Sequence, residues 1–275
     1  MLTREEAILR MKDIGCYNPD VVDRAEWKDG KVTLRTSDGN SFEFTSDSRL
    51  DDYIKAEDVK AVIIGQRFFS PDILTLELSE GFDFGSGKIT VLTSKNCVVR
   101  AVSAMLTELR ATGCGICTFC REGGYQLSAI IDPMTKPGAD KKQLDLALEI
   151  ASAMTTSCNC PVGEETALPV LTALELFRSE FEAHCGKGSC PSGECSAFST
   201  MYIDPFKCEG NGDCMDVCPV DAIEGKPGYI SMLDEYECTK CGKCIEACEN
   251  GAIQFATGRL PKLPDRLTKV GRFRK

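Results

Sequence analysis

Residues 238–248 read Cys-Thr-Lys-Cys-Gly-Lys-Cys-Ile-Glu-Ala-Cys and place Cys238, Cys241, Cys244 and Cys248 at the spacing C-x-x-C-x-x-C-x-x-x-C. A tight loop at this spacing presents three thiolates to one cubane cluster, and the fourth thiolate, one turn later, faces a second cluster. Zinc ribbons also use CxxC pairs, but they do not need four thiols at this repeated spacing. The segment therefore predicts an iron–sulfur domain around it.

An imperfect copy of this segment comes first in the chain, and each copy is followed by an Ala-Ile pair. The repeat resembles the two-cluster ferredoxins of bacteria. Its spacing predicts two clusters, one held by Cys218, Cys238, Cys241 and Cys244 and the other by Cys208, Cys214 and Cys248.

The second of these clusters departs from the pattern, because Asn211 stands where a cysteine is expected. Three thiolates can hold a [3Fe–4S] cluster, or a [4Fe–4S] cluster whose fourth iron takes water, Asn211 or Asp213; a site without a cluster is the third alternative. We expect a bound cluster because all three thiols remain, and oxygen ligation would change its potential.

The 17 cysteines of the 275-residue chain are clustered and odd in number, which favours an intracellular metal protein over a disulfide scaffold. At the N-terminus, Arg4, Glu5 and Glu6 interrupt any signal-peptide run, and Thr3 with Glu6 predicts a helix with a capping box. No segment approaches the roughly 18 apolar residues of a membrane span. We expect a cytoplasmic protein without membrane insertion.

The net charge of −10 argues against nucleic acid as the main partner, because phosphate binding needs a basic surface. The charge is uneven: residues 259–275 carry seven basic side chains against Asp265, which leaves about −16 on the rest. This basic tail is predicted either to be solvated or to lie on an acidic partner subunit.

A second cysteine group lies in Gly113-Cys-Gly-Ile-Cys-Thr-Phe-Cys-Arg-Glu-Gly123, followed by Ser157-Cys-Asn-Cys-Pro-Val-Gly163. A C-x-x-C-x-x-C loop with a distant fourth thiolate is again a cubane pattern. Residues from about 60 to 184 resemble the C-terminal part of the NADH-binding flavoprotein subunit of respiratory complex I. That family has a Cys-Gly-x-Cys-x-x-Cys-Arg-Glu-Gly loop, a Cys-x-x-Gly about forty residues later and a helix ending in Phe-x-x-Glu-Phe, as at 177–181 here.

By matching position, this resemblance implies one [4Fe–4S] cluster on Cys114, Cys117, Cys120 and Cys160. Cys158 is the neighbour that competes with Cys160, and the Pro161-Val-Gly163 that follows favours Cys160.

Residues 185–256 resemble the flavoprotein subunits of NAD-linked multimeric [FeFe]-hydrogenases, which append a Cys-Pro-x-Gly-x-Cys segment and a two-cluster ferredoxin domain. Cys190 and Cys195 match that segment. With His184, the only histidine, and Cys185 beside it, they predict a tetrahedral zinc site, with structural thiols as the alternative. Either Cys185 or a more distant thiol completes the set. Cys97 is expected to be a buried structural thiol.

The sequence predicts an α+β chain with a small β-containing N-terminal region, a helical-bundle [4Fe–4S] domain and a C-terminal ferredoxin-like two-cluster domain. We divide it into a helix and hairpin region (1–58), a remnant strand region (59–95), the helical domain (96–184), a Cys-rich knuckle or linker (185–200), the two-cluster domain (201–256) and the basic tail (257–275).

The flavin- and NADH-binding part of the family should precede residue 60, but residues 1–58 are too short and too poor in glycine to supply it. We therefore expect an electron-relay subunit with no catalytic residue, working with flavin-, molybdenum-, tungsten- or hydrogenase-type subunits and with ferredoxin. A small oxidoreductase with an unrecognised flavin site and a zinc-only scaffold are the alternatives.

Overall fold

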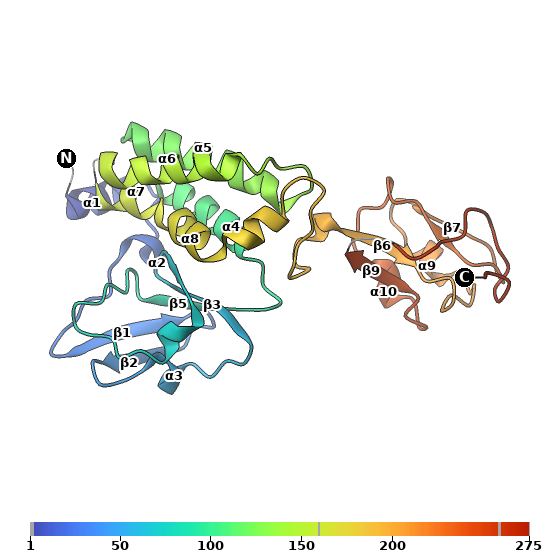
Figure 1. The fold of residues 1–275 in the computed structure, drawn as a ribbon, viewed down its shortest axis with the longest axis horizontal. Helices are drawn as coiled ribbons and strands as arrows, with labels where there is room; N and C mark the ends of the chain where they lie inside the picture. The colour runs from blue at the N-terminus through green and yellow to red at the C-terminus, as the bar shows by residue number, and fades with distance from the viewer. Residues whose placement is uncertain (1–2, 159, 258–259, 275) are drawn as a thin grey trace. The chain divides into compact units, whose positions relative to one another are not determined.

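The computed structural model describes residues 3–158, 160–257 and 260–274. The chain forms two compact units, here named the N-terminal unit (Met1–Cys195) and the C-terminal unit (Ser196–Lys275) (Figure 1). The mixed helix and strand content expected from the sequence is confirmed. The boundary between the units falls inside the predicted Cys-rich segment, while the finer six-part division stays a prediction.

A five-stranded sheet in the order β2-β1-β5-β3-β4 forms one layer of the N-terminal unit (Figure 1). Its strands are β1 (Lys31–Thr36), β2 (Ser41–Thr45), β3 (Val59–Ile64), β4 (Arg67–Phe69) and β5 (Lys88–Thr93). β1 and β2 form the hairpin predicted around the Asp-Gly turn, where Gly39 adopts φ 91°. β5 pairs in parallel with β1 and antiparallel with β3, so strands of both predicted N-terminal regions share one sheet.

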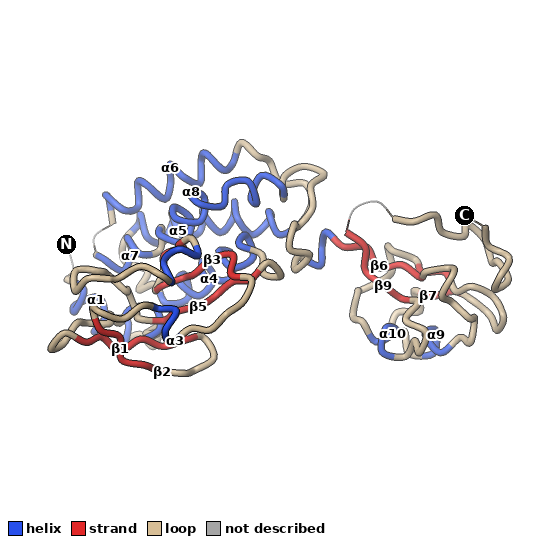
Figure 2. The backbone as a smooth tube through the Cα atoms, turned by 60° about the horizontal axis from the view of Figure 1, so that its bottom comes forward, coloured by secondary structure: helices blue, strands red, loops and turns tan. Residues whose placement is uncertain are grey.

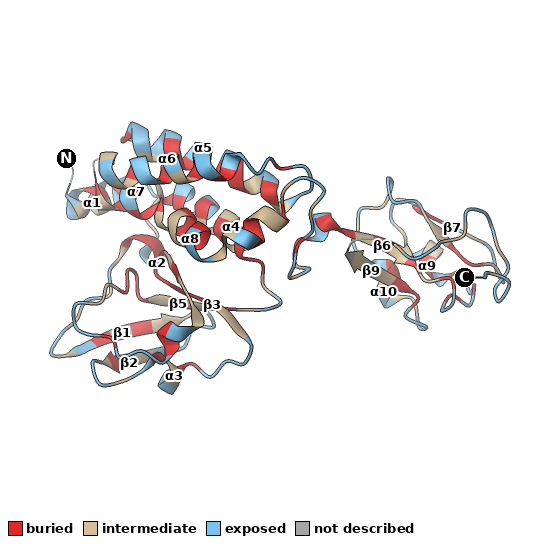
Figure 3. Cartoon of the chain, viewed as in Figure 1, coloured by how far each residue is buried: buried red, intermediate tan, exposed pale blue. Residues whose placement is uncertain are grey.

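The helices of this unit are α1 (Arg4–Asp13), α2 (Pro19–Val22), α3 (Leu50–Tyr53), α4 (Val98–Thr112), α5 (Thr118–Ile131), α6 (Gln143–Ser157), α7 (Pro161–Glu165) and α8 (Leu168–Ala183), with 3₁₀ turns η1 (Pro71–Leu74) and η2 (Asp132–Thr135). The longer helices α4, α5, α6 and α8 form the other layer of this unit, and Figure 2 shows them beside the sheet, whereas α3 and η1 pack in the core of the sheet. The predicted capping box of α1 and the end of α4 at Gly113 are both present. Each of α4, α5, α6 and α8 has buried and exposed residues along its length (Figure 3), and its buried residues are mostly apolar, as expected for amphipathic helices.

The C-terminal unit is a repeat of two similar halves. It contains η3 (Ser196–Phe198), β6 (Ser199–Ile203), α9 (Asp213–Asp216), β7 (Ile223–Glu224), β8 (Met232–Leu233), α10 (Lys243–Glu246) and β9 (Ile253–Thr257). β6 pairs with β9, and β7 pairs with β8. Each short helix follows a left-handed glycine, Gly212 at φ 97° and Gly242 at φ 83°. The internal repeat seen in the sequence is therefore a structural repeat.

The basic tail lies on the C-terminal unit rather than extending freely. The amide of Ile230 donates to the carbonyl of Thr268 at 2.8 Å, and the Phe273 ring lies 5.6 Å from that of Phe206. The tail backbone is thus fixed without a partner chain, although its cationic side chains are exposed.

None of the helices in the described ranges is long and apolar enough to cross a bilayer.

The aromatic core under the sheet gives a stability prediction. Phe84 is fully buried, and its ring lies 5.5 Å from Phe44 and 5.8 Å from Trp27, the only tryptophan. Phe84→Ala is expected to lower the free energy of unfolding by about 3–5 kcal/mol, because it leaves a cavity. Denaturant unfolding followed by Trp27 fluorescence measures this. Leu9→Ala, at an exposed position, is the control and should change little.

Candidate metal centres

The first cysteine group lies where three helices of the N-terminal unit end or begin. Cys114 lies in the turn between α4 and α5, Cys117 is the N-cap of α5, Cys120 lies in its first turn, and Cys160 is the N-cap of α7. Burial, and then the nearby thiols of Cys160 and Cys117, raise the pKa of Cys120 to about 11. The thiols are therefore close enough to repel one another as thiolates, and bound cations would relieve that repulsion.

The sulfur of Cys160 is in a setting suited to a metal ligand. Burial raises the pKa of this thiol, and hydrogen bonds from the backbone amides of Gly163 and Val162 oppose the increase. Amide donors on a cysteine sulfur favour its thiolate form. The structure therefore supports the preference for Cys160 as the fourth thiol, while the ligand set itself stays a prediction.

Cys158 brings a fifth thiol to the same place. Its side chain is buried, and its sulfur contacts that of Cys117. A Cβ atom at Gly163 would lie 2.9 Å from the Cys158 sulfur and 3.2 Å from the Cβ of Cys120. Gly163 is thus needed for these thiols to converge, which explains physically the glycine of the Cys-x-x-Gly pattern.

A further thiol, which the sequence did not single out, lies beside this group. Cys16 donates to the carbonyl of Thr112 at 3.3 Å, and its pKa is raised by burial and then by Cys114. A cysteine 98 positions before Cys114 gives no local spacing signal.

Three of the four thiols assigned to the complete ligand set accept backbone amides, namely Cys238 and Cys241 of the second copy and Cys218 of the first. The amide of Lys240 donates to Cys238 at 3.4 Å, and that of Ala222 donates to Cys218 at 3.3 Å. The amide of Lys243 donates to the exposed Cys241 and lowers its pKa. These loops hold the thiols that the spacing assigned to one cluster, with Cys244 buried beside them.

The incomplete half has the same backbone with a different side chain. Asn211 lies just before Gly212 and α9, as Cys241 lies just before Gly242 and α10. The Asn211 side chain is exposed and donates to the carboxylate of Asp213 at 2.7 Å. The fourth ligand position of this half therefore carries an amide and a neighbouring carboxylate.

The three thiols assigned to the incomplete ligand set are Cys208 and Cys214 of the first copy and Cys248 of the second. Cys208 and Cys214 are buried, burial raises the pKa of Cys214, and Cys248 accepts the amide of Ala252 at 3.3 Å. Three thiols, with the Asn211 amide and the Asp213 carboxylate at the fourth position, are compatible with both the three-iron and the four-iron alternatives.

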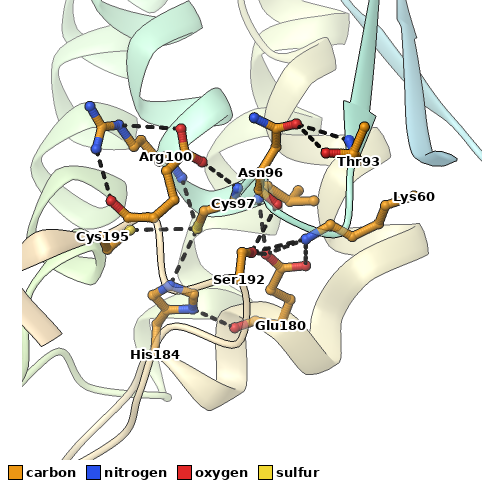
Figure 4. Close-up of polar contacts among 11 residues, drawn as sticks. Lys60, Thr93, Asn96, Cys97, Arg100, Glu180, His184, Ser192 and Cys195 are labelled. Atoms are coloured by element: carbon orange, nitrogen blue, oxygen red, sulfur yellow. Dashed lines mark hydrogen bonds and ion pairs between the residues drawn. The ribbon is translucent and has the colours of Figure 1, made fainter. Parts of the chain in front are cut away.

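A separate group in the N-terminal unit is compact enough for a single metal ion. The ligand atoms of Cys97, His184, Cys190 and Cys195 all lie within 4.8 Å of one another, and all four residues are buried. Figure 4 shows Cys97 between the other labelled members: its sulfur lies 3.3 Å from Nε2 of His184 and 3.5 Å from the sulfur of Cys195.

This group corrects one predicted ligand and one predicted role. Cys185 is not a member, because it lies just beyond α8 and its thiol turns back to the carbonyl of Phe181 at 3.3 Å. Cys97, expected to be a structural thiol, takes its place as the N-cap of α4. It lies 87 residues from His184 in the sequence, so only the tertiary fold brings the two together.

The distances fit one tetrahedral ion better than a cluster. Zinc–sulfur bonds of about 2.3 Å place two ligand sulfurs about 3.8 Å apart, close to the 3.5 Å between Cys97 and Cys195. A cubane would separate its ligands by a whole cluster, so it needs more room than this buried group leaves. The set of three sulfurs and one imidazole nitrogen is one that zinc prefers.

Surrounding hydrogen bonds orient the His184 ring. Its Nδ1 lies 2.7 Å from the carbonyl of Glu180, so in the neutral ring a proton on Nδ1 leaves the Nε2 lone pair facing Cys97 (Figure 4). Burial opposes protonation of this ring, but its hydrogen bonds to Cys97 and to the Glu180 carbonyl raise the pKa of His184 to about 9, so a metal ion bound at Nε2 would displace a proton from that atom. The Glu180 carboxylate is itself fixed by Lys60 and by the amide of Val98.

Comparisons with known proteins match two parts of the chain. Residues 100–184 match the NADH-ubiquinone oxidoreductase-F iron–sulfur binding region, and residues 200–249 match the 4Fe–4S dicluster domain.

The chain spans less than a third of the length of each of two curated relatives that it matches. The HndC subunit of the NADP-reducing hydrogenase of Solidesulfovibrio fructosivorans is 35% identical over 141 residues, covering 51% of this chain and 29% of that protein. The 51 kDa subunit of the mitochondrial NADH-ubiquinone oxidoreductase of Aspergillus niger is 30% identical over 126 residues, covering 46% and 25%.

A solved NAD⁺-reducing [NiFe]-hydrogenase in the H₂-reduced state has the same fold over 58% of this chain and 30% of its own, with a TM-score of 0.51 and 20% identity. The chain therefore joins a region that matches the NADH-ubiquinone oxidoreductase-F iron–sulfur binding region to a region that matches the 4Fe–4S dicluster domain.

Proposed function

We propose that this protein is an iron–sulfur relay subunit of a larger oxidoreductase. It holds one cluster in the N-terminal unit and two in the C-terminal unit, and electrons enter and leave through partner proteins. The observation that carries the proposal is the convergence of buried thiols on amide-lined loops in both units, within the two regions that match iron–sulfur domains.

The ligand sets remain those expected from the sequence. They are Cys114, Cys117, Cys120 and Cys160 for the first [4Fe–4S] cluster, Cys218, Cys238, Cys241 and Cys244 for the second, and Cys208, Cys214 and Cys248 with the Asn211 corner for the third.

Bound clusters would supply one-electron redox chemistry, and the chain's residues would tune the reduction potentials of the clusters and their access to water. Amides on the sulfurs of Cys160, Cys218 and Cys248 stabilise negative charge there, which favours the reduced state. Burial of Cys214 and Cys244 keeps water from two further sulfurs. Asn211, by contrast, leaves the third site open to solvent on one side.

We also propose that Cys97, His184, Cys190 and Cys195 bind one zinc ion. The donors are four in number and buried, so no position is left for a substrate or a catalytic water. The ion would join the start of α4, the end of α8 and the loop that carries Cys190 and Cys195. Its role is therefore structural.

The partners are proposed from the chemistry of the relatives. One relative is part of an NADP-reducing hydrogenase, and the other is part of an NADH-ubiquinone oxidoreductase. A flavin-, molybdenum-, tungsten- or hydrogenase-type protein would accordingly carry the substrate chemistry, with ferredoxin as a further donor or acceptor.

One cavity favours a flavin-containing oxidoreductase as the second candidate. It has a volume of about 470 Å³, within the range of ligand sites, and lies beside Cys120 with Arg110, Arg121 and Tyr125 in its lining. Release of flavin on denaturing the purified protein would favour this second candidate, whereas a flavin-free protein that still accepts electrons supports the relay.

Substitution of Asn211 tests the third cluster. Anaerobically purified protein is expected to contain about eleven or twelve irons per chain. Asn211→Cys, which adds a fourth thiolate, should give twelve and remove any three-iron EPR signal of the oxidised protein. Asn211→Ala is the control and keeps the wild-type signal. Four irons or fewer in the wild type would contradict the relay proposal.

The two competing thiols of the first cluster can be separated by mutation. Cys158→Ala should keep all four irons of that cluster, since Cys160 supplies the ligand. Cys160→Ala should yield a three-iron cluster or lose it, as judged by iron analysis and EPR. Cys185→Ala controls for the loss of an unrelated thiol. The reverse result for the two variants would assign Cys158 as the ligand.

The zinc proposal predicts a different response from two neighbouring cysteines. Cys97→Ser should reduce zinc from about one per chain to a small fraction and lower the thermal midpoint of the N-terminal unit, because it breaks a four-ligand site. Cys185→Ser should leave the zinc content unchanged. Elemental analysis decides between them, and equal zinc in wild type and Cys97→Ser would rule out this ligand set.

A further inference from the structure

The basic tail is connected to the cluster loop of the incomplete half through backbone hydrogen bonds. The amide of Val270 donates to the carbonyl of Gly228 at 3.1 Å, and the amide of Gly228 donates to the carbonyl of Gly210 at 2.9 Å. Gly210 lies between Cys208 and Asn211. A single segment, the one that contains Gly228, therefore separates the tail from the loop proposed to hold the third cluster.

The contact at Gly210 is close enough to require glycine. Its φ is 70°, and a Cβ atom there would lie 2.6 Å from the carbonyl oxygen and 2.8 Å from the amide nitrogen of Tyr229. The loop that bears Tyr229 therefore packs directly on the loop proposed to hold the third cluster, and the tail pairs with that same Tyr229 loop.

These side chains form a surface that we name the basic face, made of Lys226, Lys262, Lys269, Phe206, Tyr229 and Phe273. Lys226 and Lys269 lie 4.3 and 5.9 Å from the centre of the Tyr229 ring, and Lys262 lies 5.9 Å from that of Phe273. The three lysines are exposed, and none of them forms an ion pair within residues 3–158, 160–257 and 260–274.

The face is basic on an otherwise acidic protein. Residues 196–258 contain eleven acidic and four basic side chains, whereas residues 259–275 add seven basic side chains and one acidic one. An acidic partner is attracted at this face, whereas the rest of the chain carries about −16 and repels it on average. Such an arrangement orients the partner as well as attracting it.

We infer that the basic face docks an acidic one-electron carrier protein of the ferredoxin type, next to the cluster held by Cys208, Cys214 and Cys248. The inference rests on the proposed relay function and adds the entry point for electrons. In the exchange, the carrier's cluster is oxidised by one electron and the protein's cluster is reduced by one, or the reverse. No bond forms or breaks, and no proton has to move.

A compact protein fits the face better than an extended polyanion. Glu209 and Asp213 are exposed in the adjacent cluster loop, so a nucleic acid or an anionic bilayer, whose charge continues past the lysines, would meet repulsion there, whereas a compact carrier can confine its acidic side chains to the lysines. The exposed Phe206 ring adds apolar contact to the face, a common feature of protein interfaces.

The test compares two triple variants of the full chain. Lys226→Gln/Lys262→Gln/Lys269→Gln removes three charges of the basic face, and Lys28→Gln/Lys95→Gln/Lys142→Gln removes three exposed charges from the N-terminal unit. Each protein is mixed anaerobically with a pre-reduced acidic [2Fe–2S] ferredoxin, and the second-order rate constant is measured against ionic strength. Reduction by methyl viologen radical cation, a small cationic dye, reports on the clusters themselves.

The basic-face variant should react with ferredoxin at least about 10-fold more slowly than wild type at low salt, with the difference vanishing at high salt. The control variant should match wild type, and both variants should react normally with the dye. Equal low-salt rates for wild type and the basic-face variant would overturn the docking site while leaving the relay intact. Failure of the wild type to accept electrons from the dye would instead overturn the relay itself.

Discussion

The mutual repulsion of buried thiolates is the constraint on which this structure depends. Burial and the neighbouring sulfurs raise the pKa of Cys120, and burial raises that of Cys214, so neither thiol ionises readily by itself. A fold that buries so many thiols in sets is stable in its functional form only when cations hold them. The helix N-caps and backbone amides aimed at sulfur in both units provide part of the same compensation.

Two kinds of site meet this constraint in different ways. The proposed cluster sites take most of their thiols from one short loop each, with one thiol from a distant segment, and the backbone of such a loop adopts left-handed conformations at residues such as Lys240 and Gly242. The Cys97 group instead draws its members from the start of one helix, the end of another and a loop. It depends on the packing of α4 against α8 and on the Glu180 carbonyl that orients His184.

This difference explains how much could be predicted from the sequence. The repeat, the hairpin, the end of α4 at Gly113 and the loops around Cys114 and Cys238 follow from local spacing and turn chemistry, and they are present. Cys97 could not be identified, because its partners lie 87 and more residues away and a single buried cysteine is usually structural. The position of the tail was also unpredictable: its pairing depends on Gly210, whose missing side chain matters only once the Tyr229 loop lies on it.

The exposure of Asn211 has a consequence for where oxidative damage to the protein would begin and how it would be repaired. The backbone has the same conformation before α9 and before α10. Only the first of these loops, however, has no thiolate at its second ligand position, where the exposed Asn211 stands instead. Oxidants and chelators would reach that corner first, so damage would begin with the loss of a single iron there. Because the three remaining thiols keep the rest of the site assembled, one ferrous ion and one electron would restore it, and the protein would not have to be replaced.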